Sequence, residues 1–407
     1  MQENGFEAVA KYTEQFDGAS ITLANVLATQ SEINNATNTL LPEEKRAMKE
    51  MKKRIQRFVK IQKNSMKDVV WRNKEGTTSL VFRPVERVGI YVPAGRAPLF
   101  SSLFMAALPA KEAGVQEIIV CSPPNKNGNV SEYILAAAKM CGVEKIYKIG
   151  GAQAIGAMAY GIEEMEQVNV ICGPGNAYVN AAKQEVATNA QVRIDVPAGP
   201  SEVLIIADKT ANAAYAAADM LAQSEHGYDS AAICICTDVK IALQIAQELQ
   251  KQLEKLPQDN AAFQSIPKWG KIFVAKNMKS AIAAANEIAP EHLELMIRLE
   301  NAKSLLPKIK NTGAVFVQTA EAFCDYGMSG GNHILPTGSA AKAWGGVSVQ
   351  TFGKWMYVDG ITVKAQETLA KKTALLARME GLEAHAKAAE IRNKIGKKEN
   401  GKLKERK

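Results

Sequence analysis

From Arg87 onwards, short runs of β-branched residues alternate with alanine-rich segments of helical composition, and this alternation limits the possible folds more than any other feature. The apolar runs are RVGIYV, EIIVCS, KIYKIG, VNVICG, VLIIAD, AAICICT, KIFVA and AVFVQ. Strands and helices that alternate at this spacing are typical of parallel sheets connected by helices. About eight strands could form one large sheet or two smaller ones. The sequence therefore predicts an α/β fold.

The two ends of the chain lack this alternation. Residues 1–85 are charged and of helical composition, and their clearest amphipathic segment is LPEEKRAMKEMKKRIQRFVKIQK. The segment AQETLAKKTALLARMEGLEAHAKAAEIRNKI predicts a final helix with no strand after it. We therefore expect helical N- and C-terminal segments on either side of the α/β region.

Cysteine use and the absence of long apolar runs indicate a cytoplasmic protein. The six cysteines include no C-x-x-C pair, and most lie in apolar runs, which is typical of free thiols in a reducing compartment. Neither a signal peptide nor a stretch of about 18 apolar residues is present. Cys324, beside Asp325, could be a nucleophile, but an apolar filling role is the favoured interpretation.

The net charge of +8 is concentrated at the C-terminus. Residues 391–407 contain eight Lys or Arg and two Glu, which leaves the rest of the chain near neutral. A basic tail can bind nucleic acid or acidic lipid. This tail has no aromatic residue that could stack on a base, so we expect a solvated end rather than a nucleic-acid or membrane partner.

Three glycine-bearing turns follow predicted strands: VPAG at 92–95, IGGAQAIG at 149–156 and CGPGNAY at 172–178. Glycine there allows a phosphate to approach the backbone, and the following helix N-terminus favours an anion. None has the G-x-G-x-x-G spacing, so plain turns and nucleotide-binding turns both remain open. The turn DVPAGPSE, at 195–202, either presents Ser201 and Glu202 to a ligand or only steers the chain.

The chain has only four histidines, and each lies near a carboxylate and near glycine or proline. Gln223 and His226 are three residues apart, so on a helix they share a face and offer donors that suit zinc. A histidine in the last turn of a helix that ends at Gly227 is the alternative.

Two further segments place a carboxylate and a histidine together. Asp325 and His333 lie in the glycine-rich loop CDYGMSGGNHILPT. Glu380 and His385 lie on the last predicted helix, where a spacing of five is poor for one face and a surface helix with ion pairs is the alternative.

Pro290 precedes Glu291 and His292, and proline suits the first position of a helix. We therefore expect both residues in a first helical turn, where the helix dipole favours a carboxylate and a neutral imidazole. Such a pair can act as bases, although Glu291 could simply suit the dipole. Taken together, the four histidine segments predict a metal or acid–base site without naming a reaction.

The motifs in their order closely resemble the histidinol dehydrogenase family over residues 12–385, nearly the whole chain. The segments that carry this resemblance are ERVGIYVPAGRAPLFSS, KIGGAQAIGAMAYG, CGPGNAYV, DVPAGPSEVLIIAD, AQSEHGYDS, APEHLEL, DYGMSGGNHILPTGS and EGLEAH.

The resemblance implies a zinc- and NAD-dependent enzyme that oxidises L-histidinol to L-histidine through a bound aldehyde, the last step of histidine biosynthesis. The implied zinc ligands are Gln223, His226, Asp325 and His385. The implied catalytic bases are Glu291 and His292. The implied NAD contacts are Tyr91, Gln153 and Asn176. The implied substrate contacts are Ser201, His333 and Glu380, together with Gln223, His226, His292, Asp325 and His385.

The resemblance also implies an architecture. It comprises two incomplete Rossmann-like parallel-sheet domains in an intertwined homodimer, because the family takes the counterpart of His385 from the second subunit. We expect the first domain, with the metal and catalytic residues, to comprise residues 1–90 and 205–345. The NAD-binding domain would comprise 91–204, and a helical dimerisation segment with the basic tail would comprise 346–407.

Two alternatives remain. The first is a paralogous zinc- and NAD-dependent dehydrogenase of another small polar alcohol, an amino or sulfonated diol, because the loop from Asp325 to His333 departs from the family pattern. The second is a non-catalytic binding protein that uses the basic tail. Such a protein would be expected to have lost a metal or base residue, and all of them are present.

Overall fold

The computed structural model describes residues 2–94, 97–163, 165–197 and 199–392. The chain divides into two compact units, one of residues 1–63 with 84–352 and one of residues 64–83 with 353–407. The predicted solvated tail beyond residue 392, Gly95 of the VPAG turn and Ala198 of DVPAGPSE lie outside the described residues.

The larger unit contains two five-stranded parallel sheets with the same strand order. The first sheet has the order β5-β4-β3-β6-β7 and the second has the order β10-β9-β8-β11-β12. In each sheet the order reverses beside the first strand, as in a Rossmann fold that lacks its sixth strand. The expectation of two incomplete Rossmann-like sheets is therefore confirmed.

The strands of the first sheet are β3 (Arg87–Tyr91), β4 (Glu117–Cys121), β5 (Lys145–Tyr147), β6 (Val170–Cys172) and β7 (Arg193–Ile194). Those of the second are β8 (Glu202–Ala207), β9 (Ala231–Cys236), β10 (Lys271–Val274), β11 (His292–Met296) and β12 (Ala314–Val317). All eight predicted runs form strands. The sequence missed β7, which has only two residues, and β11.

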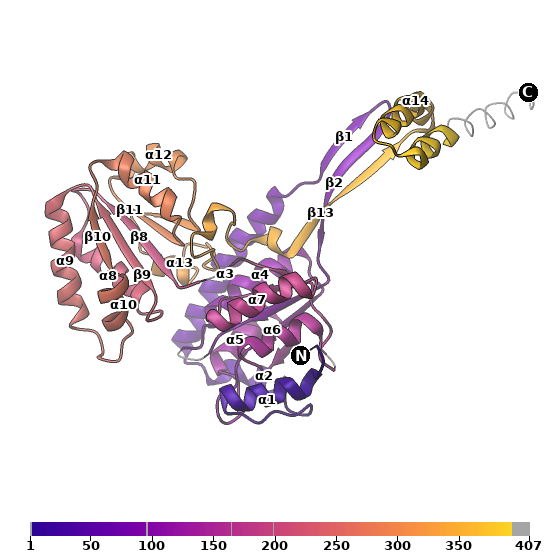
Figure 1. The fold of residues 1–407 in the computed structure, drawn as a ribbon. Helices are drawn as coiled ribbons and strands as arrows, with labels where there is room; N and C mark the ends of the chain where they lie inside the picture. The colour runs from indigo at the N-terminus through magenta and orange to yellow at the C-terminus, as the bar shows by residue number, and fades with distance from the viewer. Residues whose placement is uncertain (1, 95–96, 164, 198, 393–407) are drawn as a thin grey trace, which may run out of the picture. The chain divides into compact units, whose positions relative to one another are not determined.

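Helices cover both faces of the second sheet (Figure 1), and alternate residues of its strands pack against the two helix layers. One layer comprises α8 (Ala213–Ser224), α9 (Val239–Leu253) and α10 (Ala262–Trp269), and the other comprises α11 (Met278–Ile288) and α12 (Leu299–Leu305). Val203 and Ile205 pack toward the first layer, and Leu204 and Ile206 toward the second. Because both faces of a parallel sheet are covered, its strands are continuous apolar runs. A single turn, η1 (Leu306–Lys308), continues α12.

The first sheet is covered in the same way, and the N-terminal helices belong to its cover. Its helices are α4 (Phe100–Ala113), α5 (Glu132–Cys141), α6 (Gly151–Tyr160) and α7 (Ala177–Asn189). Three helices precede them: α1 (Gly5–Asp17), α2 (Gln30–Thr39) and α3 (Pro42–Ser65). Helix α1 packs on α6, and α2 packs on α5. These two helices were expected with the domain of residues 205–345, but their apolar faces are buried against the first sheet's helices.

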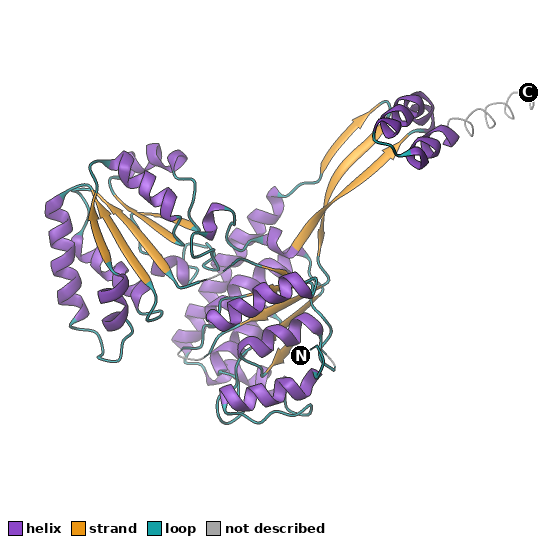
Figure 2. Cartoon of the chain, viewed as in Figure 1, coloured by secondary structure: helices purple, strands orange, loops and turns teal. Residues whose placement is uncertain are grey.

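The smaller unit corrects the expectation that both ends are purely helical (Figure 2). Its three strands are β1 (Val69–Asn73), β2 (Gly76–Pro84) and β13 (Gly353–Ile361), in the order β1-β2-β13. The β1–β2 hairpin turns where the Asn73 side chain accepts hydrogen bonds from the N–H groups of Glu75 and Gly76, a turn that asparagine favours. Valine, tryptophan and threonine suit this hairpin better than a helix.

The last helical segment is also not one continuous helix. Helix α14 (Val363–Met379) is followed by its C-cap residue Glu380, and a second helix occupies residues 383–392. Gly381 between them has a φ of 77°, a left-handed conformation that glycine adopts without strain. The Arg378 guanidinium bridges the two helices by pairing with Glu383 and Glu390.

The segment around Pro290 forms a strand rather than a helix start. Helix α11 ends at Ile288, Ala289 is left-handed, and β11 begins at His292. Two parallel neighbours, β8 and β12, pair with β11 on either side. Proline is common both soon after a helix C-terminus and at a helix start, so the local sequence permits both arrangements and the pairing of β11 selects one.

No helix in the described part of the chain has the length and apolar composition needed to cross a membrane.

Candidate functional site

Glu291 and His292 lie at the amino end of β11, an inner strand of the second sheet. His292 pairs in register with Val203 of β8 and Ala314 of β12. The next residue, Leu293, faces the helix layer of α11, so His292 and Glu294 project from the opposite face of the strand. Both residues are almost fully buried, with 3% and 1% exposure. The sheet thus holds an imidazole and a carboxyl group in a dry environment.

Helix α13 (Glu321–Asp325) presents two carboxylates to His292. Glu321 and Asp325 are four residues apart and therefore share one face of this short helix. Glu321 Oε2 lies 3.1 Å from His292 Nδ1, and Asp325 Oδ1 lies 3.8 Å from His292 Nε2. Glu321 Oε2 therefore lies beside Nδ1, while Nε2 has no hydrogen-bond partner among the described residues and is the nitrogen open to a substrate.

Glu321 was not among the residues that the sequence singled out. Its spacing to Asp325 was visible, but its contact with His292 depends on where α13 lies against β11. Glu321 is 1% exposed, and burial together with the Asp325 charge raises the pKa of its carboxyl group well above the usual value.

Helix α8 brings Gln223 against the same pair. Gln223 is fully buried, and its Nε2 lies 3.4 Å from Glu291 Oε2 and 3.3 Å from His292 Nδ1. The backbone N–H of Glu202 also donates to Glu291 Oε2, at 3.0 Å. Burial raises the pKa of Glu291 to about 7, which suits a general base that works near neutral pH.

His226 lies beyond the end of α8, not on its face as expected. The helix ends at Ser224, and the backbone N–H of His226 donates to the Gln223 carbonyl. Desolvation lowers the pKa of His226, whereas the Asp325 charge raises it, and the His292 charge lowers it further. His226, Asp325 and His292 therefore lie within electrostatic reach of one another.

A second carboxyl pair lies behind this cluster. Asp219 is one turn before Gln223 on α8, and its side chain is hydrogen-bonded to Glu294 of β11. Burial raises the pKa of Glu294 to about 10 and that of Asp219 to about 6. Glu294 therefore carries a proton at neutral pH and can donate it to Asp219, so this pair needs no cation.

His333 has both ring nitrogens engaged. Its Nδ1 lies 2.7 Å from the Asp325 carbonyl oxygen, and its Nε2 lies 3.1 Å from the Ser102 hydroxyl. Because a carbonyl oxygen only accepts, Nδ1 carries the proton and Nε2 accepts from Ser102. A substrate group that binds His333 must therefore displace Ser102 from Nε2. Ser201, half-buried directly before β8, accepts a backbone bond from Ala231 through its carbonyl oxygen.

Two of the four side chains expected to hold zinc have buried oxygen atoms without a hydrogen-bond partner among the described residues. These atoms are Gln223 Oε1 and Asp325 Oδ1. Buried acceptors are normally paired, and amide, imidazole and carboxylate donors suit zinc. The residues present therefore fit the metal. Within the described ranges no three His, Cys, Asp or Glu side chains form a metal-binding group; His226 and Asp325 are two such residues, and Gln223 adds an amide.

The three expected NAD contacts lie at the carboxyl edge of the first sheet. Tyr91 ends β3, Gln153 lies in the first turn of α6 after β5, and Asn176 is the N-cap of α7 after β6. The order of this sheet reverses between β3 and β6. Open α/β sheets bind ligands outside the carboxyl ends of their strands at such a reversal. The geometry therefore favours a dinucleotide at this edge.

A buried ion pair supports the glycine-rich turn that leads to Asn176. Lys183 Nζ pairs with Asp195 Oδ1, and both side chains are almost completely buried. Asp195 Oδ2 accepts from the N–H of Gly173 at 2.8 Å, and Lys183 donates to the Gly173 carbonyl at 3.1 Å. Gly173 has a φ of 127°, and a Cβ there would collide with the Tyr91 carbonyl oxygen. The pair thus fixes a turn that only glycine allows.

Glu380 and His385 belong to the smaller unit. Glu380 caps the C-terminus of α14, and His385 is exposed on the helix of residues 383–392. Within the larger unit the structure brings together Gln223, Glu291, His292 and Asp325.

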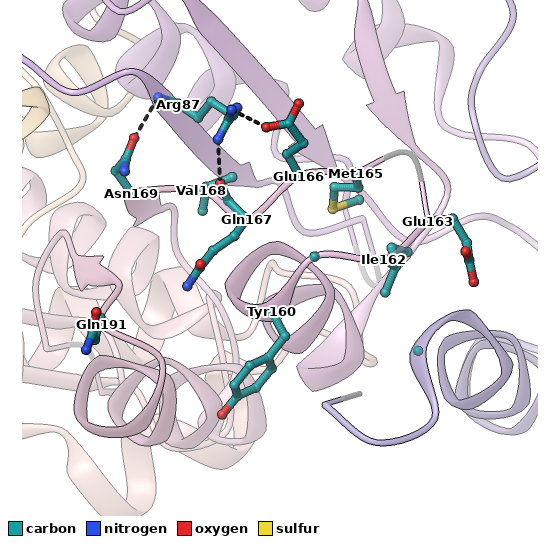
Figure 3. Close-up of a pocket in the computed structure, with 12 residues that line it drawn as sticks. Arg87, Tyr160, Ile162, Glu163, Met165, Glu166, Gln167, Val168, Asn169 and Gln191 are labelled. Carbon is teal, nitrogen blue, oxygen red and sulfur yellow. Dashed lines mark hydrogen bonds and ion pairs between the residues drawn. The ribbon is translucent and has the colours of Figure 1, made fainter.

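A surface cavity of about 690 Å³ lies at the opposite edge of the first sheet (Figure 3). Arg87, at the amino end of β3, pairs with Glu166 there and bonds to Gln167 and Asn169. None of the predicted site residues is among its described lining residues. Because no residue expected to bind metal, substrate or NAD is among these lining residues, we assign this cavity no part in the site.

Comparison with known proteins places the whole chain in one family. A family model described as "Histidinol dehydrogenase" matches residues 1–393. Histidinol dehydrogenase from Haemophilus influenzae is 40% identical over 392 residues, which cover 96% of this chain and 89% of that protein. The enzyme from Listeria innocua is 42% identical over 399 residues, with coverages of 96% and 90%.

Solved structures agree. The crystal structure of histidinol dehydrogenase from Elizabethkingia anophelis has a TM-score of 0.90 to this chain at 39% identity, covering 95% of this chain and 88% of that one. An acetylating aldehyde dehydrogenase from Geobacillus thermoglucosidasius, at a TM-score of 0.52 and 15% identity, shares the fold alone. The chain belongs to the histidinol dehydrogenase family.

Proposed function

We propose that this chain oxidises L-histidinol to L-histidine in two steps, each of which reduces one NAD, with the aldehyde held between them. The observation that carries the proposal is the convergence of Gln223, Glu291, His292 and Asp325 at the amino end of β11. An acid–base pair beside free metal-ligand atoms is what an alcohol oxidation followed by an aldehyde hydration requires.

In the first step His292 acts as the base. Its Nε2 has no hydrogen-bond partner among the described residues, and Nδ1 is held against Glu321. Nε2 takes the proton of the substrate hydroxyl group while the carbon-bound hydrogen leaves as hydride to NAD. The products of this step are the aldehyde, NADH and one proton. The buried position of His292 keeps bulk water away from the aldehyde.

In the second step Glu291 is the base. Its carboxylate, fixed by the Glu202 N–H and by Gln223, takes a proton from water as the water oxygen adds to the aldehyde carbon. The proton that His292 took in the first step passes to the aldehyde oxygen, which completes the hydrate and leaves His292 neutral. The hydrate then loses a second hydride to a second NAD while His292 accepts a hydroxyl proton, and the product is the carboxylic acid. No cysteine takes part.

Gln223, His226 and Asp325 would hold the zinc ion, together with His385 of a second copy. When bound, this ion would position the imidazole and amino nitrogens of the substrate and stabilise charge on its oxygen. Ser201, His333 and Glu380 would complete the substrate site, and Tyr91, Gln153 and Asn176 would contact NAD.

A homodimer is supported by the surface of the smaller unit. All five residues of β1 and eight of nine in β13 are exposed. The exposed apolar side chains on this unit include Val69, Trp71, Trp355, Tyr357, Val358, Leu375, Leu376 and Met379. A three-stranded sheet with so much exposed apolar surface is expected to be covered. We propose that a second copy covers it and that each copy supplies His385 to the other's site.

Mixing two inactive variants tests this shared site. His385→Ala and His226→Ala are each expected to lose activity, but subunits exchanged between them should form heterodimers with one intact site. Recovery of a substantial fraction of wild-type activity on mixing, with a dimer mass by light scattering, supports the proposal. Mixed samples that stay as inactive as the separate variants contradict it.

The proposed reaction is tested by the NADH formed per L-histidinol consumed with zinc-loaded protein. Two NADH per substrate are expected. If zinc is bound and L-histidinol yields no NADH, the reaction is not this one, and other amino and sulfonated alcohols become the candidates because of the altered loop from Asp325 to His333.

We place the enzyme in the cytoplasm, since its cysteines are free thiols.

Cys324→Ala is expected to retain activity within about twofold of the wild type, because a protonated thiol is a poor nucleophile. Burial raises the pKa of the Cys324 thiol, and its Sγ accepts a hydrogen bond from Ser329. The measurement is kcat with L-histidinol in a variant whose melting temperature matches the wild type. Loss of most activity would show that the thiol, rather than water, attacks the aldehyde.

A further inference from the structure

Asp17 lies at the amino end of α6, beside two of the residues expected to contact NAD. Its Oδ2 accepts a hydrogen bond from Gln153 Nε2 at 3.3 Å, and the backbone N–H of Gly150 also donates to this carboxylate. Next to it, the N–H of Gly151 donates to the Tyr91 hydroxyl at 3.1 Å. Two backbone N–H groups at the N-terminus of α6, those of Gly150 and Gly151, are therefore hydrogen-bonded to side chains of the protein itself.

This arrangement changes what the glycine turn before α6 can bind. A helix N-terminus with free N–H groups attracts phosphate, and the sequence pattern IGGAQ allowed that role here. In the structure a carboxylate already fills the anion position. A Cβ on Gly150 would stand 2.5 Å from Pro123 Cβ and 3.0 Å from both Asp17 oxygens, so the absence of a side chain leaves room for Pro123 and for the Asp17 carboxylate.

The position of Asp17 is unfavourable for its own helix. It is the last residue of α1, where the negative end of the helix dipole disfavours a carboxylate. Gly18, in the left-handed conformation, closes α1 and directs the chain away. Burial raises the pKa of Asp17 to about 6. A costly carboxylate held beside Gln153 and Tyr91 indicates a role in what binds there.

We propose that Asp17 selects NAD against NADP. Its carboxylate occupies the anion position at the N-terminus of α6, where it can accept a hydrogen bond from a ribose hydroxyl group of NAD and repels the ribose phosphate of NADP. Many dinucleotide sites use an acidic side chain on the ribose in this way, supplied by a strand of the same sheet. Here an N-terminal helix supplies it. The inference rests on the NAD site of the proposed function.

Asp17→Asn tests the inference. The amide keeps an oxygen that can accept from Gly150 and Gln153 but removes the charge. We expect the ratio of kcat/KM for NADP to that for NAD to rise about tenfold or more, since like charges in contact are strongly unfavourable. The KM for L-histidinol and the melting temperature should stay near the wild-type values.

Glu14→Gln is the matched control. Glu14 lies exposed one turn earlier on α1, so the net charge changes equally while the site does not. The inference is overturned if the NADP-to-NAD ratio of kcat/KM changes less than threefold in Asp17→Asn. It is also overturned if this ratio changes as much in Glu14→Gln as in Asp17→Asn. If the wild type reduces neither coenzyme with L-histidinol, the proposed function fails instead. The ratio of Kd values for NAD and NADP, from calorimetry, then tests Asp17 separately.

Discussion

His292→Ala is expected to lower kcat for L-histidinol oxidation by about 10³-fold, the usual contribution of a well-placed general base. The reason is geometric. His292 Nε2 lies 3.8 Å from Asp325 Oδ1, an atom of an expected metal ligand, and has no hydrogen-bond partner among the described residues. It is therefore the basic atom nearest to where the substrate oxygen would bind. Steady-state NADH formation by the zinc-loaded variant measures the effect, with its zinc content checked.

Glu321→Gln distinguishes a base from the group that orients it. The amide retains an oxygen that can accept from His292 Nδ1, but unlike the carboxyl group it cannot ionise when the imidazole gains a proton. We expect kcat to fall about tenfold, with little change in the KM for L-histidinol. A loss in Glu321→Gln as large as that in His292→Ala, or a KM effect without a kcat effect, would contradict a role for Glu321 in orienting His292.

The second large effect is expected for Glu291→Gln, which should stop the reaction at the aldehyde. Glu291 is 8% exposed and has a pKa of about 7, so at neutral pH it can take a proton from water, and its amide replacement cannot. We expect the rate with the aldehyde as substrate to fall about 10³-fold, while the first hydride transfer persists. The yield should approach one NADH per L-histidinol in a single turnover.

Glu202→Gln serves as the control for Glu291→Gln. Glu202 is a half-buried neighbour whose backbone N–H, not its side chain, contacts Glu291. The Glu202→Gln variant loses the same charge as Glu291→Gln but should still give two NADH per L-histidinol. If both variants block the aldehyde step equally, hydration of the aldehyde depends on the overall charge of the site and not on a base at Glu291. If Glu291→Gln still yields two NADH at the wild-type rate, another group activates the water.

The strands of both sheets were predictable because their signal is local. Eight apolar runs of five to seven residues, bounded by turn residues, carry this signal, and all eight form strands. β11 shows the limit of that signal. Pro290 fits both a helix start and the end of a preceding helix, and only pairing with β8 and β12 selects the strand. The β1–β2 hairpin was missed for the same reason, since its partner β13 is far along the chain.

The same division runs through the candidate site. Residue types and short spacings were enough to single out Gln223, Glu291, His292 and Asp325, because donor chemistry and glycine or proline neighbours are local properties. The contact between Glu321 and His292 follows from the packing of α13 on β11. The hydrogen bond between Asp17 and Gln153, which are 136 residues apart in the sequence, follows from the packing of α1 on α6. No local periodicity specifies such contacts. They depend on which apolar faces are buried together, and that is settled only when the whole chain folds.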